Sequence, residues 1–203
     1  MDRGLLGGVR LAIAALTLAA LGAQIERGSD EPGFGIVEFF SYFTVESNLI
    51  AAAVLVAAGV LALRGARDER VDRLRGAATL YMTVTGLGYA ILLSGDDSPL
   101  LPWANVVVHY LTPIWMVADW TIDRPPRPIP FAEVVGAWMA FPTAFFLYTL
   151  IRGEIVDWYP YLFLDVSEHG YLGVLIAGAV VGLAMIGTTR LLTRSTAVRQ
   201  PAG

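Results

Sequence analysis

The sequence predicts an all-α membrane protein: a six-transmembrane-helix bundle with its N- and C-termini in the cytoplasm. Three observations lead to this prediction. Of the 203 residues, 56% are hydrophobic and only 16% are charged, whereas soluble domains carry about 25% charged residues. Apolar stretches long enough to cross a bilayer recur along the whole chain. The arginines gather in alternate connecting segments, as the positive-inside rule requires of cytoplasmic loops.

Six stretches are long and apolar enough to cross the ~30 Å hydrocarbon layer as helices. We expect these spans at residues 5–25, 37–63, 74–93, 103–120, 131–151 and 170–192. The segments between them are polar or contain proline and glycine. No internal repeat or second domain is evident, so a single domain over residues 1–203 is expected.

The distribution of arginine orients these spans. If the N-terminus is cytoplasmic, twelve arginines belong to that side and only Arg27 and Arg152 to the other. Both termini then face the cytoplasm, and the outer loops are acidic and aromatic. All 14 basic residues are arginines in a chain rich in Ala, Gly, Val and Leu, which is typical of a GC-rich bacterial gene. The expected location is therefore the plasma membrane of a bacterium.

Missing residue types exclude several chemistries. Without cysteine there is no disulfide, no thiolate nucleophile and no thiolate-bound metal. Without lysine there is no Schiff base to retinal or pyridoxal phosphate. Two histidines provide little material for a metal site, and no basic aromatic patch indicates nucleic-acid binding. We expect no cofactor, no metal and no nucleic acid, and membrane lipids as partners.

The fourth predicted span carries an unusual polar stripe. Asn105, His109 and Thr112 recur at i, i+4 and i+7, which places them on one helix face. An ionisable group in hydrocarbon is costly and is therefore a functional candidate. Pro113 has no N–H to pair with the carbonyl of His109, so the helix should bend at the histidine. The alternative is that His109 only forms a hydrogen bond across a helix interface.

The second predicted span carries a matching polar face, formed by Thr44, Ser47 and Asn48 at i, i+3 and i+4. This face is too polar for lipid and should point inward, although such hydroxyls often bond only to their own helix backbone. At 1.5 Å per residue, Thr44 and His109 both lie roughly 8–10 Å below the outer surface. Tyr89 falls near the same level, whereas Asp119 lies about 15 Å deeper, toward the cytoplasm.

Three motifs resemble one known family. They are YFTVESNL at 42–49, NVVVHYLTP at 105–113, and WYPY at 158–161 followed by Leu164 and Asp165. Together they resemble small bacterial six-helix membrane proteins that are distant relatives of the eukaryotic androgen-induced membrane proteins. The three motifs occur in the family's order and on the expected spans.

This resemblance implies an activity. The eukaryotic members are intramembrane hydrolases of fatty acid esters of hydroxy fatty acids, with a threonine nucleophile and a histidine. By resemblance, Thr44 is the nucleophile and His109 the base, and the substrate is such a lipid ester. The residues available to bind the substrate or stabilise the oxyanion are Ser47, Asn48, Asn105 and Tyr89. A backbone carbonyl or Tyr89 is available to orient the imidazole.

Two other readings of the same residues stay open. The protein can be a transporter or a membrane protein that binds a small or lipidic ligand, with His109 and Glu46 handling protons. Gly86, Gly88 and Pro142 would then give broken or closely packed helices, although no inverted repeat accompanies them. Alternatively, the protein is not an enzyme and its polar stripes only hold helices together.

Overall fold

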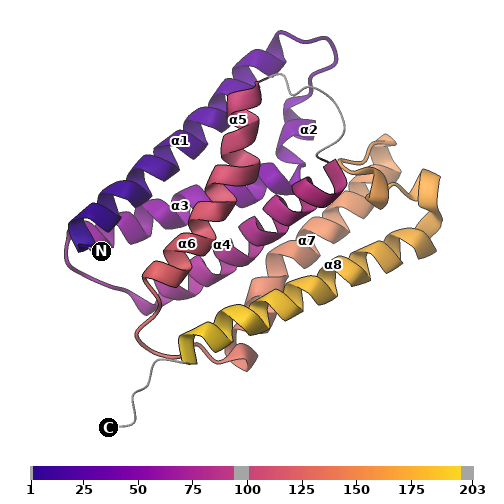
Figure 1. The fold of residues 1–203 in the computed structure, drawn as a ribbon. Coiled ribbons are helices and arrows are strands. Elements are labelled where there is room, and N and C mark those ends of the chain that lie inside the picture. The colour runs from indigo at the N-terminus through magenta and orange to yellow at the C-terminus, as the bar shows by residue number, and fades with distance from the viewer. Residues whose placement is uncertain (1, 94–100, 198–203) are drawn as a thin grey trace. The chain divides into compact units, whose positions relative to one another are not determined.

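The computed structural model describes residues 2–93 and 101–197. It is 84% helical, and the described residues contain no strand, which confirms the all-α class. The chain divides into two compact units, Met1–Pro126 and Arg127–Gly203. Figure 1 draws both along the chain, and each unit is described by itself below.

Four of the described helices are long and apolar enough to cross a membrane, consistent with a membrane protein. The other two predicted spans, 74–93 and 103–120, fall on helical segments that change type along their length and do not meet this criterion as single helices. The four helices are α1 (Arg3–Ser29), α3 (Phe43–Leu63), α7 (Phe131–Val156) and α8 (Val166–Ala197).

In the described part of the first unit, α1 and α3 are accompanied by the α-helices α2, α4, α5 and α6. The short helix α2 (Ile36–Phe40) precedes α3, and α4 (Glu69–Gly88) continues directly into the π-helix η1 (Tyr89–Leu93). Next, α5 (Pro102–Val106), the π-helix η2 (Val107–Leu111) and α6 (Thr112–Ile122) follow without a break and are called the α5–α6 rod. This rod packs against both α1 and α4 (Figure 1).

The predicted second span, residues 37–63, is not one continuous helix. Residues 36–40 form the separate helix α2, and α3 begins only at Phe43. The hydroxyl of Ser41 donates to the carbonyl of Val37 at 2.7 Å, and Tyr42 adopts an extended conformation. A serine that bonds to the preceding turn offers the backbone an alternative to a continuing helix. A hydropathy window averages over such a break and cannot detect it.

Small residues bring α1 and α3 unusually close together. A Cβ atom added to Gly7 would lie 2.9 Å from the carbonyl oxygen of Gly59, and one added to Gly59 would lie 3.1 Å from that of Gly7. Without a strong hydrophobic driving force inside a bilayer, such close backbone contact is a main source of helix association. The core beside this contact is also built largely from small and flexible side chains: Ala14, Ala51, Ala52, Val54, Leu55, Ala78, Met82 and Met116.

The second unit is a hairpin of α7 and α8 joined through the short 3-10 helix η3 (Leu162–Leu164). Gly178 of α8 lies where a Cβ atom would meet the ring of Phe146 at 2.8 Å, so the two helices pack closely there. At the connecting segment, Tyr171 donates to Glu154 at 2.6 Å. Gly170 has a φ of 64°, which marks a kink near the start of α8.

Candidate functional site

Three polar residues predicted to face inward are buried in the first turns of α3. Thr44 retains 8% of its exposed surface, and Ser47 and Asn48 retain none. This confirms the predicted inward-facing polar face. Thr44 is the second residue of α3. The depth of Thr44 below the outer surface was expected from a helix that starts at residue 37, so that depth does not apply to α3. Its position at the helix N-terminus places it at the positive end of the helix dipole, which favours negative charge.

The side chain of Asn48 joins α3 to the α5–α6 rod. Its amide nitrogen Nδ2 donates to the carbonyl of Thr44 at 2.8 Å and to the carbonyl of Val108 at 3.1 Å. Because both oxygens lie about 3 Å from one nitrogen, they are no more than about 6 Å apart. Asn48 thus brings the turn that carries Thr44 next to the turn that carries His109.

The carbonyl that Asn48 reaches is released by the π-helix η2. The N–H of Thr112 donates to the carbonyl of Val107, one residue further back than in an α-helix. The carbonyl of Val108 therefore loses its i+4 donor, and its i+5 residue is Pro113, which has no N–H. The bend predicted at His109 takes the form of this π-turn, and the side chain of Asn48 satisfies the freed carbonyl.

His109 is half-buried and has two close partners. Its ring nitrogen Nδ1 lies 3.2 Å from the carbonyl oxygen of Asn105. The ring of Tyr89 stacks on the imidazole with centroids 3.9 Å apart and 19° between the planes. Asn105 also donates its side-chain amide to the hydroxyl of Tyr89 at 2.7 Å. Both groups considered for orienting the imidazole, a backbone carbonyl and Tyr89, therefore contact it.

The predicted polar stripe on the fourth span is split by η2. Asn105 and His109 contact Tyr89 of η1, whereas the hydroxyl of Thr112 lies 2.8 Å from that of Thr17 on α1. The spacing i, i+4, i+7 places three residues on one face only in a regular α-helix. A π-turn adds one residue to the turn and rotates the following residues by about 100°. The prediction that Thr112 shares the face of His109 is therefore wrong.

Three of the four candidates for binding an oxyanion differ in their free hydrogen-bonding groups. The amide of Asn48 has already donated both hydrogens, and its remaining oxygen Oδ1 can only accept. The hydroxyl of Ser47 is buried and has no hydrogen-bond partner within the described residues. Asn105 has one amide hydrogen beyond the one donated to Tyr89. Ser47 and Asn105 are therefore better donors than Asn48, whose position makes it a bridge between helices.

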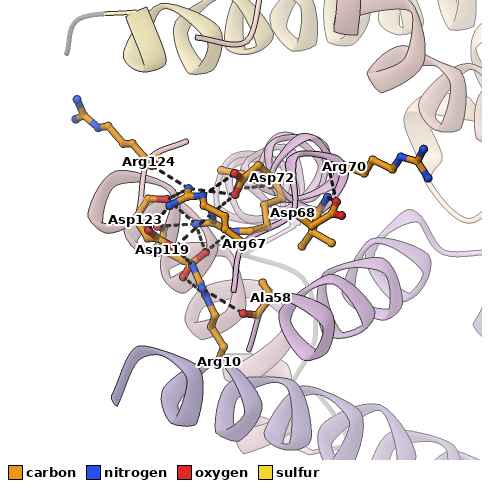
Figure 2. A network of polar contacts seen from close by, with 12 residues as sticks. Arg10, Ala58, Arg67, Asp68, Arg70, Asp72, Asp119, Asp123 and Arg124 are labelled. Atoms are coloured by element: carbon orange, nitrogen blue, oxygen red, sulfur yellow. Dashed lines mark hydrogen bonds and ion pairs between the residues drawn. The ribbon is translucent and has the colours of Figure 1, made fainter. Parts of the chain in front are cut away.

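A second polar cluster of the first unit includes Asp119 and Asp123, at the C-terminal end of α6 (Figure 2). It pairs three arginines with three aspartates through ion pairs of 2.7–2.9 Å. The central carboxylate, Asp119, is 1% exposed and accepts from two arginines that are 2% and 1% exposed. We call this cluster the Arg–Asp network; its members are Arg10, Arg67, Asp72, Arg75, Asp119 and Asp123.

The network is neutral as a whole, because its three positive and three negative charges balance. Burial alone would raise the pKa of Asp123, but the hydrogen bond from Arg10 and the charges of Arg75 and Arg67 lower this pKa below its ordinary value. Burial alone would lower the pKa of Arg67, but its ion pairs with Asp72 and Asp123 raise this pKa above its ordinary value. The network ties α1, α4 and α6 together with charges that each have opposite partners.

Two arginines of this network are among the twelve that the positive-inside rule assigns to the cytoplasmic side. Arg10 and Arg75 lie inside helices and are almost completely buried. Removing them from the count of twelve leaves ten arginines against two, so the predicted orientation does not depend on them. Charged residues within membrane-spanning segments usually pair with one another, so Asp119 in the predicted fourth span was the sequence signal for such partners.

No protein-family model, curated protein or solved structure matches this chain at a significant level. Within residues 2–93 and 101–197, no group of three or more His, Asp or Glu residues is arranged to hold a metal ion.

Proposed function

We propose that this protein is an intramembrane lipid-ester hydrolase in which Thr44 is the nucleophile and His109 the general base. The substrates are fatty acid esters of hydroxy fatty acids or similar acyl esters, a class that comes from the resemblance of the motifs around Thr44 and His109. The observation that supports the proposal most is the Asn48 bridge, because it holds the carbonyl of Thr44 and the carbonyl preceding His109 on one nitrogen.

The reaction proceeds in two acyl-transfer steps. The imidazole takes the hydroxyl proton of Thr44 as that oxygen attacks the ester carbonyl. The tetrahedral intermediate collapses, the ester C–O bond breaks, and the leaving alkoxide takes the proton from His109, which gives an acyl-threonine and a hydroxy fatty acid. Water then attacks the acyl group while His109 takes its proton. Collapse of this second intermediate returns the proton to Thr44 and releases the fatty acid.

The negative charge that develops on the carbonyl oxygen needs donors that are already in place. The unpaired hydroxyl of Ser47 and the remaining amide hydrogen of Asn105 are suited to this role. The position of Thr44 in the first turn of α3 adds the favourable field of the helix dipole.

The Arg–Asp network favours hydrolysis over transport as the function of this site. A transporter needs to open alternately toward both sides of the membrane. Asp119 lies ten residues beyond His109 in the sequence, about 15 Å along the rod, and ion pairs there hold α1, α4 and α6 together. A helix group that is locked by buried ion pairs suits a hydrolase better than a protein that must open alternately at both ends.

Ester hydrolysis by purified variants tests the proposal. The wild-type protein in detergent micelles is given a branched fatty acid ester of a hydroxy fatty acid, and fatty acid release is measured. We expect Thr44→Ala and His109→Ala to lower the rate by about 10²–10⁴-fold, and Thr44→Ser to retain activity. Thr83→Ala is the matched control, since Thr83 bonds only to the carbonyl of Thr79 in its own helix. Wild-type rates in both Thr44→Ala and His109→Ala would refute the proposal.

We further propose six spans with cytoplasmic termini. In this topology, α4 with η1 forms the third span and the α5–α6 rod the fourth, and the ten-to-two split of arginines supports the orientation. The chain has no cysteine. A single introduced cysteine is therefore the only thiol of the protein, and its labelling shows on which side of the membrane it lies. We expect a membrane-impermeant maleimide added to intact cells to label Asp30→Cys and Trp103→Cys but not Ala66→Cys. Labelling of Ala66→Cys, or protection of Trp103→Cys, would contradict the topology.

A further inference from the structure

Two π-helices of the first unit lie opposite each other at the candidate site. Tyr89 is the first residue of η1, and His109 is the central residue of η2. Each π-turn re-aims a side chain that a regular α-helix would point elsewhere, and such turns occur often at functional sites. The stacked pair of Tyr89 and His109 is the contact that the two turns form together.

The ring of Tyr89 is fixed on three sides. Its hydroxyl accepts the amide of Asn105 at 2.7 Å, its face covers the imidazole of His109, and its ring makes an edge contact with Tyr110 at a centroid distance of 5.5 Å. Gly86, three residues earlier, lies where a Cβ atom would be 2.9 Å from Pro113. The missing side chain of Gly86 therefore lets α4 come close enough to place Tyr89 over the histidine.

Asn105 holds both members of this pair. Its backbone carbonyl oxygen lies 3.2 Å from Nδ1 of His109, and its side chain holds the hydroxyl of Tyr89. A carbonyl oxygen only accepts hydrogen bonds. In the neutral imidazole, the ring proton must then be on Nδ1, which leaves Nε2 as the basic nitrogen.

We propose that Tyr89 is the positioning residue of His109: its ring clamps the imidazole against Asn105, so that the proton stays on Nδ1 and Nε2 is the base. The catalytic consequence of this role rests on the proposed hydrolase function, but the clamp itself is a property of the folded protein. Stacking requires the ring, whereas the hydroxyl only anchors that ring to Asn105. Phenylalanine at position 89 should therefore preserve most of the clamp, and leucine should remove it.

Nitrogen NMR of the imidazole tests the clamp without relying on activity. The chain has two histidines, so the His169→Gln variant labelled with ¹⁵N-histidine gives the signals of His109 alone. His169 is exposed in the second unit. When the imidazole of His109 is neutral, we expect a proton on Nδ1 and none on Nε2. This is the reverse of the tautomer that free histidine prefers. We also expect the carbon-bound ring protons of His109 to be shifted upfield by the ring of Tyr89.

Variants at position 89 then separate a clamp from a general structural role. Tyr89→Phe should keep the upfield shift and the proton on Nδ1. Tyr89→Leu should lose the shift, mix the two tautomers and lower kcat by about 10- to 100-fold with little change in KM. A wild-type imidazole protonated on Nε2, or signals that do not change in Tyr89→Leu, would overturn the proposal. A correct tautomer in a protein that hydrolyses no ester would leave the clamp standing and refute only the hydrolase assignment.

Discussion

Removing the central carboxylate of the Arg–Asp network should destabilise the first unit severely. In Asp119→Ala, two guanidinium groups lose their shared partner while they stay buried. Arg10 loses a bond of 2.7 Å from Nε, and Arg75 loses bonds of 2.9 and 2.7 Å from Nε and a terminal nitrogen. Asp123 and Asp72 still pair with these arginines, so part of the compensation survives.

The size of the effect follows from this geometry. Removing one partner of a buried ion pair costs about 3–5 kcal/mol, because it leaves an uncompensated charge in an apolar environment. Two arginines that are 2% and 1% exposed depend on Asp119, so we expect the upper part of this range. The matched control is Glu69→Ala, which breaks an exposed pair with Arg73 at 3.2 Å. Exposed pairs of this kind contribute only about 0–1 kcal/mol.

Equilibrium unfolding in mixed micelles, followed by circular dichroism, measures both variants. Asp119→Ala should unfold at a much lower denaturant fraction than Glu69→Ala. A double variant in which Asp119 and Arg10 both become apolar residues of similar size should recover part of the lost stability, because Arg67 and Arg75 then stay balanced by Asp72 and Asp123. Equal stability of Asp119→Ala and Glu69→Ala would refute the reasoning that this network is held in a low-dielectric interior.

Three further perturbations have defined outcomes. Asn48→Ala should lower the free energy of unfolding by about 1–3 kcal/mol, measured in the same micelles, because the carbonyl of Val108 is left unpaired; an unchanged value would contradict the bridge. Gly59→Val should lower the free energy of unfolding by about 1–3 kcal/mol, because its Cβ atom would lie 3.1 Å from a backbone oxygen of α1. Gly22→Val should lower it less, because no atom lies within 4 Å of an added Cβ there. The pKa of Asp123 is lower in the folded protein than its ordinary value of 3.8, so the ionised carboxylate stabilises the fold at pH values above 3.8. This stabilisation should be lost as the pH falls through the folded pKa. The free energy of unfolding should therefore depend less steeply on pH in Asp123→Asn than in the wild type.

Several features of the site were predictable from residue spacing. The buried face of Thr44, Ser47 and Asn48 follows from three polar residues at helical spacing in an apolar segment. The interruption near His109 follows from Pro113, which cannot donate a backbone hydrogen bond. Local chemistry of this kind depends on residues a few positions apart, so the sequence contains all of the relevant information.

Other features depend on contacts that spacing does not encode. Nothing in the sequence distinguishes a bend at Pro113 from a π-turn, and the π-turn moves Thr112 away from His109 toward Thr17. The pairing of Arg10 with Asp119 joins residues that are 109 positions apart. Such a pair emerges only when α1 and α6 are packed side by side.

The central claim is that Thr44 is a nucleophile activated by His109, and covalent trapping tests it most directly. Purified wild-type protein is treated with a long-chain alkyl fluorophosphonate, digested and analysed by mass spectrometry. We predict one phosphonyl adduct, located on Thr44, that is absent from Thr44→Ala and strongly reduced in His109→Ala. An adduct on another residue, or labelling of Thr44 that is unaffected by His109→Ala, would contradict the claim, as would protein that hydrolyses the ester without forming an adduct.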